Sequence, residues 1–501
     1  MDKAVPHRHR CSERRTQHWF LLLPARPGWY WELFPALALA LIAAALRLEL
    51  LLRFPLLYDG DAYGRWLERS NPFQAPWVPL FQLCIFLLTR LADSIFAVQL
   101  LAVCFGVTAI LAFWLLLYRA FGASIAYLGA LALALQPLLI VFSIVPYQEG
   151  LFLTLAFLAL WLALLPGQPR WRWLALVVGL AALTRYEGWL LALLLWLLFL
   201  WRQKKAGILG WRFAAGSALA LGWAPLLWIV IQRNISPTGF QTLAPTLNPT
   251  ALLTTVRFLW PVWSLQLGLI GSILVLGGFV WLGWQAWHGS ELAWLLLVFL
   301  VGDLLVIAFL DPYTPNNLRL PLLSLPVVLM GMAGLLVDGA RFLSRRFPWL
   351  ASQNRWLWGL WLPLTALLLL WFVPITTNFV AGYDALVRPA YLAAEALPHS
   401  LSPEAPVALI GNATDEGAFD VYAQQAGWQG QVIPLIPANV SAPTQLAAAL
   451  QAGHARLLII FGPAASSAGP LALARSGFLL PAEKGPGYVI WAVQAFAGTR
   501  P

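Results

Sequence analysis

The chain has 501 residues, of which 60% are hydrophobic and only 10% are charged, and its mean hydropathy is +0.75. A soluble fold has too little interior to bury so much apolar surface, so the composition predicts a polytopic membrane protein with helical spans. The formal net charge of +10 comes from basic residues scattered in short loop clusters, which excludes nucleic acid as the expected partner.

The first residues form a basic tail that contains Arg8, Arg10, Arg14 and Arg15. No small-residue cleavage site follows a short apolar run, as it would in a secretory signal peptide. We therefore expect residues 1–30 to be an uncleaved cytoplasmic tail. The three cysteines, one in this tail and two in apolar segments, do not predict a disulfide framework.

Long apolar segments follow the tail as far as residue 376. They lie at about 33–53, 77–91, 95–118, 123–143, 150–165, 172–184, 188–201, 211–232, 259–284, 291–310, 320–338 and 356–376. A full span needs roughly 20 residues, and four of these segments, 77–91, 150–165, 172–184 and 188–201, are shorter. We expect residues 31–376 to form the transmembrane catalytic domain.

Basic loops set the expected orientation, because they favour the cytoplasmic side. The tail, 202–205 and 341–346 should lie inside, which leaves everything after 376 outside. An even number of spans would contradict this, so we expect about 11 or 13 crossings. The segment 77–91, flanked by prolines before and by Arg90 and Asp93 after, is the candidate that does not cross.

The sequence changes character after residue 376, and short apolar runs alternate with polar stretches. The runs at 407–411, 431–434, 457–462 and 488–493 read as strands, and 418–426, 444–452 and 470–476 read as helices between them. Residues 377–501 therefore predict a small extracytoplasmic α/β domain with a largely parallel sheet. No glycine-rich phosphate loop precedes its helices, so we expect no nucleotide site there.

The most unusual polar stretch comes directly after the first apolar segment. Residues 58–66 contain Asp59, Asp61, Tyr63 and Arg65. Ionisable residues near a bilayer are costly and tend to line functional cavities. The alternative is a solvated loop whose aspartates cap a short surface helix.

Other ionisable residues are predicted on the same external face. Arg185 and Glu187 lie between two short segments and should occupy a dip at the membrane surface. Glu149 follows Tyr147 at the start of an apolar segment, where a helix N-terminus by itself favours an acid. Arg319 precedes a later segment, where anchoring to lipid headgroups is an equal alternative.

This combination of side chains predicts a transfer reaction. Arginines bind a phosphate and stabilise it as a leaving group, and an aspartate accepts a proton from an incoming hydroxyl. A phosphate met at the bilayer surface by a chain without a nucleotide loop indicates a lipid-linked donor.

Several motifs resemble those of the GT-C superfamily of integral-membrane glycosyltransferases. The likeness is to the bacterial family-39-like transferases that use polyprenyl-phosphate sugars, relatives of protein mannosyltransferases and aminoarabinose transferases. The motifs are Asp59 with Tyr63, the proline-rich stretch 71–80, Pro137 with Ser143 and Glu149, the turn 183–188, and Arg319-Leu-Pro continuing to Leu325-Pro326. The resemblance covers about residues 30–340.

The resemblance implies a role for each of these residues. Asp59 would be the general base, and Asp61 would orient the acceptor or help Asp59 bind a metal, Mg²⁺ or Mn²⁺. Arg185, Arg319 and Tyr63 would hold the donor phosphate. The remaining residues of the implied site are Glu149, Glu187, Tyr147 and Arg65.

The resemblance also implies the reaction and its location. A sugar would pass with inversion from a polyprenyl phosphate to a hydroxyl of a glycan, lipid or protein. The enzyme would lie in the bacterial plasma membrane, with its N-terminus in the cytoplasm and its C-terminal domain outside.

Two other functions stay open. An oligosaccharyltransferase shares the superfamily, but its Trp-Trp-Asp-Tyr-Gly motif does not occur here. A transporter or flippase for lipid-linked sugars would show repeated halves and polar residues at mid-depth, and neither pattern is evident in the sequence.

Overall fold

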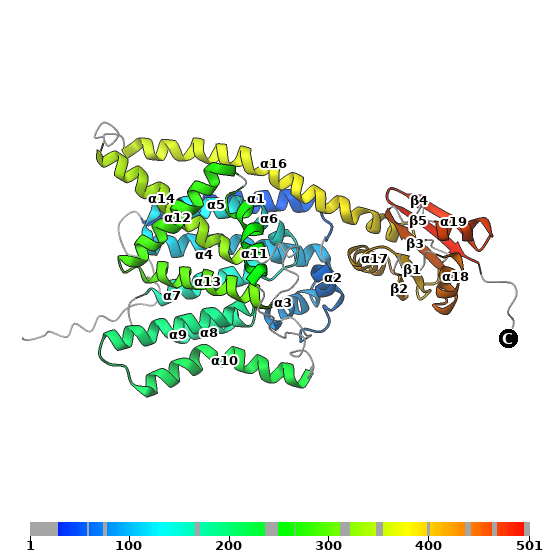
Figure 1. Ribbon diagram of the computed structural model, residues 1–501, viewed down its shortest axis with the longest axis horizontal. Coiled ribbons are helices and arrows are strands. Elements are labelled where there is room, and N and C mark those ends of the chain that lie inside the picture. The colour runs from blue at the N-terminus through cyan, green and yellow to red at the C-terminus, as the bar shows by residue number, and fades with distance from the viewer. Residues whose placement is uncertain are drawn as a thin grey trace, which may run out of the picture.

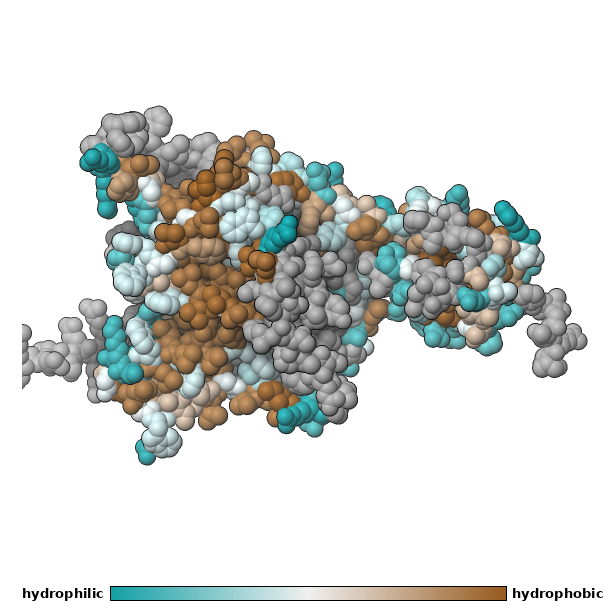
Figure 2. All heavy atoms as spheres, viewed as in Figure 1, coloured by the Kyte–Doolittle hydropathy of each residue, from teal (hydrophilic) through white to brown (hydrophobic). Residues whose placement is uncertain are grey.

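The computed structural model describes two parts, a helical bundle and a small C-terminal domain (Figure 1). The described residues are 29–57, 60–73, 78–165, 171–235, 249–265, 267–310, 321–346, 354–397, 401–435, 442–462 and 468–494. Apolar side chains gather over the middle of the bundle, and hydrophilic ones gather toward its ends and on the C-terminal domain (Figure 2). This banding is what a chain spanning a bilayer requires.

The bundle consists of helices of very unequal length. They are α1 (Trp29–Arg53), α2 (Gly60–Leu67), α3 (Pro79–Thr89), α4 (Ile95–Phe121), α5 (Ala123–Leu135), α6 (Pro137–Ile144), α7 (Glu149–Ala163), α8 (Trp171–Ala182), α9 (Glu187–Lys205), α10 (Trp211–Ile235), α11 (Pro249–Trp263), α12 (Gly268–Trp287), α13 (Glu291–Leu310), α14 (Pro321–Arg346) and α16 (Asn354–Glu395). Among the described helices, six are long and apolar enough to cross a membrane, namely α1, α4, α10, α12, α14 and α16. The chain is thus a multi-pass membrane protein, and the number of 11 or 13 crossings stays a prediction.

Helices α5 and α6 together make a further candidate span, which is bent by 60°. The bend lies at Gln136, whose backbone is extended with φ −66° and ψ 119°. A residue before proline is pushed out of the helical region, and Pro137 has no N–H to continue the ladder. The Gln136 side chain accepts a hydrogen bond from the Leu138 N–H at 3.1 Å and so caps the new helix.

Helix α3 is the short segment that was expected not to cross. It is roughly 16 Å long by its rise per residue, about half the thickness of a bilayer core. The Leu80 N–H donates to the Leu183 carbonyl at 2.8 Å. Beyond the other end, Asp93 pairs with Arg69 at 2.8 Å. We call the end of the bundle that carries α2, α3 and the turns 145–148 and 183–186 the domain end, because the C-terminal domain lies beside it (Figure 1).

Two sequence-based boundaries differ from the structure. The single segment expected at 259–284 is wrong, because α11 ends at Trp263 and α12 begins at Gly268. Leu265 between them has a left-handed φ of 55°, a break that hydropathy does not register. The segment expected to end at 376 continues as α16 to Glu395, which carries the chain into the C-terminal domain.

The C-terminal domain has a five-stranded sheet in the order β2-β1-β3-β5-β4. Its strands are β1 (Val407–Ile410), β2 (Val432–Pro434), β3 (Leu457–Phe461), β4 (Leu479–Gly485) and β5 (Tyr488–Val493), and its helices are α17 (Ala413–Gln425), α18 (Pro443–Ala452) and α19 (Ala468–Arg475). The expected small α/β domain is confirmed.

The expectation of a largely parallel sheet is wrong. Strand β1 is parallel to β2 and β3, but β5 runs antiparallel to both β3 and β4. Strand β4 escaped prediction because most of its residues, including Glu483 and Lys484, are polar or exposed. It pairs with β5 through a hairpin in which Gly487 has a φ of 81°.

Helices α12 and α14 cross in backbone contact. A Cβ on Gly278 would lie 2.8 Å from the Met332 nitrogen, and a Cβ on Gly331 would lie 2.7 Å from the Gly278 oxygen. Small residues allow such close approach between membrane helices. This contact therefore depends on both glycines.

We expect Gly278→Ala to force α12 away from α14 and to reduce stability by about 1–3 kcal/mol, as overpacking does. The measurement is thermal unfolding of the purified protein in detergent. Gly283→Ala is the matched control, because a Cβ there meets nothing within 4 Å on the same helix. Equal melting temperatures for the two variants would contradict the close crossing.

Candidate functional site

The short helix α2 carries three of the predicted site residues, and two of them point into the protein. Tyr63 is 1% exposed, Arg65 is fully buried, and Asp61 is partly exposed. The Tyr63 hydroxyl donates to the Leu57 carbonyl at 2.7 Å. The alternative of a solvated loop is therefore wrong for Tyr63 and Arg65. Asp59 lies outside the described residues.

Arg65 ties α2 to two other elements at the domain end. Its Nη2 donates to the Gln148 side chain in the turn before α7. Its guanidinium lies 5.5 Å from the centre of the Phe81 ring in α3. Gln82, also in α3, donates to the Arg65 carbonyl at 2.9 Å. Helix α2 is thus held by α3 and by the turn before α7.

Arg185 is the centre of a buried ionic cluster. Its Nη1 bonds to Glu149 at the start of α7, and its Nε lies 3.1 Å from the Glu187 carboxylate at the start of α9. Glu149 is fully buried and the Arg185 side chain is only 8% exposed. Such pairs are strongly held only when the remaining polar atoms are also satisfied.

Asp303 in α13 is a fourth member of this cluster that the sequence interpretation missed. It is 1% exposed and interacts electrostatically with Arg185 and Glu187. Among the described residues, neither of its carboxylate oxygens has a hydrogen-bond partner. The signal was present in the sequence, because an aspartate inside a twenty-residue apolar helix marks a functional candidate.

The α2 contacts and the Arg185 cluster meet at adjacent residues. Gln148 accepts from Arg65, and its neighbour Glu149 accepts from Arg185. Tyr147, one residue earlier, is buried with its ring 5.2 Å from that of Phe142. Most of the predicted site residues therefore converge at the domain end. Arg319 lies outside the described residues.

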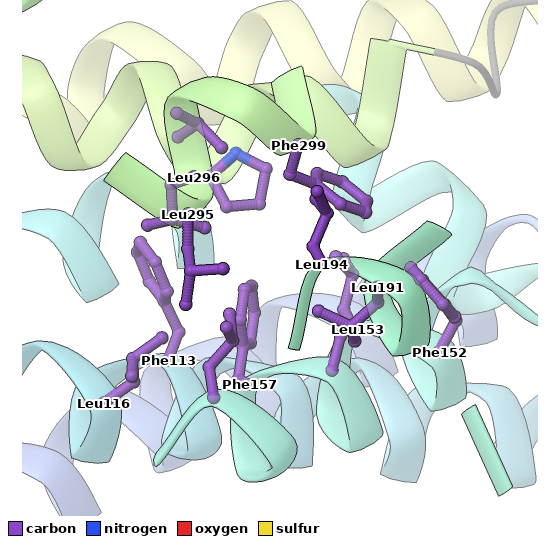
Figure 3. Close-up of a pocket in the computed structure, with 14 residues that line it drawn as sticks. Phe113, Leu116, Phe152, Leu153, Phe157, Leu191, Leu194, Leu295, Leu296 and Phe299 are labelled. Carbon is purple, nitrogen blue, oxygen red and sulfur yellow. The ribbon is translucent and has the colours of Figure 1, made fainter. Parts of the chain in front are cut away.

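An apolar cavity lies one helical turn deeper than the ionic cluster. Phe152, Leu191 and Phe299, which line it, are a turn away from Glu149, Glu187 and Asp303 respectively. The cavity measures about 30 Å³, and all fourteen lining residues are apolar. Figure 3 shows phenylalanine and leucine side chains reaching into it from the surrounding helices. A water molecule in this cavity would find no polar partner, so the cavity does not bring water to the ionic cluster.

A larger cavity of about 370 Å³ lies between α6, α11 and α16. Its wall is mostly apolar, with Leu265, Phe372 and Phe379 among its residues. Its polar groups come from Gln136, at the bend between α5 and α6, and from Arg257, which is exposed. An apolar wall with a guanidinium at its edge suits a ligand with a hydrocarbon chain and an anionic head.

One family model and several solved structures are similar to this chain. Residues 71–228 match the family model described as dolichyl-phosphate-mannose-protein mannosyltransferase. ArnT from Cupriavidus metallidurans, solved with undecaprenyl phosphate, is similar with a TM-score of 0.59 and 16% identity, over 94% of this chain and 99% of that one. The oligosaccharyltransferase AglB from Archaeoglobus fulgidus was solved with an inhibitory peptide and a dolichol-phosphate. It is similar with a TM-score of 0.54 and 12% identity, over 86% of this chain and 69% of that one. No curated protein matches the chain.

The chain has the fold of the GT-C membrane glycosyltransferases, and residues 71–228 match one family of this kind. The membrane helices and the small C-terminal sheet agree with this fold. The roles of the individual site residues stay predictions.

No group of three metal-ligating side chains occurs among the residues that the structure describes. One similar structure, the Archaeoglobus fulgidus oligosaccharyltransferase, was solved in complex with zinc and sulfate. Asp61 of the expected metal pair is described, whereas Asp59 is not. Metal binding by this pair stays a prediction.

We expect Arg185→Gln to destabilise the protein by about 3–5 kcal/mol, because it leaves buried carboxylates without their cation. Asp303→Asn is the matched variant, since it removes a charge from the same cluster but breaks no described hydrogen bond. It should unfold at or above the temperature of the unaltered protein. Thermal unfolding in detergent at neutral pH measures both. A larger loss for Asp303→Asn than for Arg185→Gln would contradict the assigned cluster.

Proposed function

We propose that the chain transfers a sugar from a polyprenyl-phosphate donor to an acceptor hydroxyl on the extracytoplasmic side of the membrane. The observation that carries this proposal is the large cavity with apolar walls, Arg257 and Gln136, in a bundle whose polar residues gather at the domain end. The similar ArnT structure, which holds undecaprenyl phosphate, supports a donor of this chemical class.

In the proposed reaction, the acceptor oxygen attacks the anomeric carbon while the bond from that carbon to the phosphate oxygen breaks. The acceptor proton passes to the Asp59 carboxylate, and the polyprenyl phosphate leaves with its electron pair. A single displacement inverts the anomeric carbon. Cations near the phosphate stabilise the charge that develops on it.

The geometry divides the arginines into two groups. Arg185 already directs three of its five N–H donors to Glu149 and Glu187, whose two carboxylates offset its charge and weaken its attraction for a phosphate. Arg257 is exposed at the edge of the large cavity. We therefore assign first contact with the donor phosphate to Arg257, together with the Arg319 that the sequence predicts. Arg185 then acts by holding the site together.

The second candidate is an oligosaccharyltransferase, which the likeness to AglB supports. The two activities differ in what is transferred, a single sugar or a preassembled glycan. Mass spectrometry of the product distinguishes them, because the acceptor gains the mass of one sugar or of many.

We expect Asp59→Asn to reduce sugar transfer about 100- to 10,000-fold, the usual contribution of a general base. The assay uses protein reconstituted in vesicles with synthetic polyprenyl-phosphate sugars, and it measures the new glycosidic bond. Glu68→Gln is the matched control, because it removes a partly exposed acid just after α2. Full activity of Asp59→Asn would overturn the catalytic assignment, and substrate movement across sealed vesicles without a new bond would indicate a transporter.

We expect Arg257→Ala to weaken binding of polyprenyl phosphate by about 1.5–3 kcal/mol, the scale of hydrogen bonds to charged groups. Native mass spectrometry or a fluorescent polyprenyl phosphate in detergent micelles measures this. Arg233→Ala, which removes an exposed arginine at the end of α10 outside the cavity, is the control. Equal affinities for the two variants would exclude Arg257 from the donor site.

A further inference from the structure

The C-terminal domain contacts the bundle through α17, which lies against α2 and α16 (Figure 1). The contact includes hydrogen bonds to one backbone residue. The Leu57 N–H donates to the Tyr422 hydroxyl of α17 at 2.7 Å, and the Leu57 carbonyl accepts from the Tyr63 hydroxyl of α2 at 2.7 Å. Both polar groups of Leu57 are thereby bound, one of them by the C-terminal domain.

A glycine brings α17 directly onto the site helix. A Cβ on Gly417 would lie 2.9 Å from Cδ2 of Tyr63, so no larger residue fits without a shift of α17 or of the ring. The Tyr63 ring is therefore held on one side by the backbone of α17. Its hydroxyl is held at the same time by Leu57.

Tyr422 itself is rigidly placed. It is 6% exposed, and its ring meets that of Tyr391 in α16 edge to face at a centroid distance of 5.1 Å. Burial raises the pKa of Tyr422, so its side chain is a neutral hydroxyl at physiological pH. Tyr422 thus connects α16, α17 and the chain just before α2.

This contact is distinct from the domain's own core. Residues of α18 and α19 pack with β1 and β3 in a separate buried cluster. The face of α17 with Phe419 and Tyr422 instead belongs to the same continuous cluster as Ala62, Tyr63 and Trp66 of α2. One face of the domain is therefore self-contained, and the other is completed by the bundle.

Helix α2 needs such support. It has only eight residues, and isolated helices shorter than about 12–15 residues are marginal in water. Its position therefore depends on what packs against it, namely α3, the turn at Gln148 and α17. Of these, only α17 comes from outside the bundle.

We propose that the C-terminal domain is a positioning element for the transfer site, and that Tyr422 and Gly417 hold Leu57 and α2 in the arrangement that turnover requires. This inference rests on the proposed function. Tyr422 acts here as a positioning residue, because it reaches the site only through the backbone of Leu57. Sugar transfer would then depend on docking of the C-terminal domain.

The first test is Tyr422→Phe in the full-length protein. In this variant the Leu57 N–H has no hydroxyl to donate to, so hydrogen–deuterium exchange in peptides covering residues 54–66 should become faster. Misplacement of a site by about 1 Å can cost about 100-fold in rate, so kcat for sugar transfer should fall about 10- to 100-fold. The donor KM should stay the same, since the large cavity is not altered. Tyr488→Phe, which removes a hydroxyl from β5 of the same domain, is the control.

A second variant guards against a general folding defect. Gly417→Ala places a methyl group against the Tyr63 ring, and Gly382→Ala in α16 places one in open space. Gly417→Ala should reproduce the lower kcat and the faster exchange while the melting temperature of the bundle changes little. Gly382→Ala should behave as the unaltered protein.

The outcomes separate the two proposals. Faster exchange with unchanged kcat would show that Tyr422 holds the domain without positioning the site, and unchanged exchange would show that the contact does not hold Leu57. Either result, with an active unaltered protein, overturns the positioning role alone. An unaltered protein that transfers no sugar from any polyprenyl-phosphate donor overturns the proposed function instead.

Discussion

The arrangement of the domain end depends on one buried cation. Arg185 bonds to Glu149 and Glu187 and lies near Asp303, so it joins the first residues of α7 and α9 to the last third of α13. In an apolar bundle these carboxylates have few other partners, and removing the cation would leave them uncompensated. The dry cavity one turn deeper keeps water from relieving that cost. The three helices are therefore held together by the ionic cluster and, one turn deeper, by apolar side chains around the cavity.

The lengths of the helices bear on why this ionic cluster lies toward one end of the bundle. Helices α3, α7 and α8 are shorter than a full span, and α5 bends into α6. Short apolar helices end before they reach the far interface, so their ends create a dip in which charged residues avoid hydrocarbon. Helix α2 lies at the same end of the bundle. Its Arg65 side chain donates a hydrogen bond to Gln148, the residue before Glu149. The polar character of this end therefore follows first from the lengths of the helices and only then from the particular side chains.

Much of this could be predicted from the sequence, because hydropathy and the placement of rare charges report directly on membrane burial. The apolar segments, the small α/β domain and the residues Arg185, Glu149 and Arg65 were all recognisable in this way. The residues with which these side chains pair could not be predicted. Arg185 meets Glu149 across 36 positions in the sequence, and Leu57 meets Tyr422 across 365. No local pattern encodes such distances. Strand β4 and the turn at Leu265 were missed for a different reason, because hydropathy registers neither a polar, exposed strand nor a left-handed residue.

The pairing of charges also bears on which cation would meet the phosphate of the proposed donor. A guanidinium that already has two carboxylate partners attracts a phosphate less strongly, because the carboxylates offset its charge and occupy most of its N–H donors. Arg185 is in this position, and Arg65 is buried between Gln148 and the Phe81 ring. Arg257 differs from both because it is exposed beside a cavity with apolar walls. Residue type alone ranks the three arginines equally, whereas their surroundings favour Arg257 for an anionic ligand with a hydrocarbon chain.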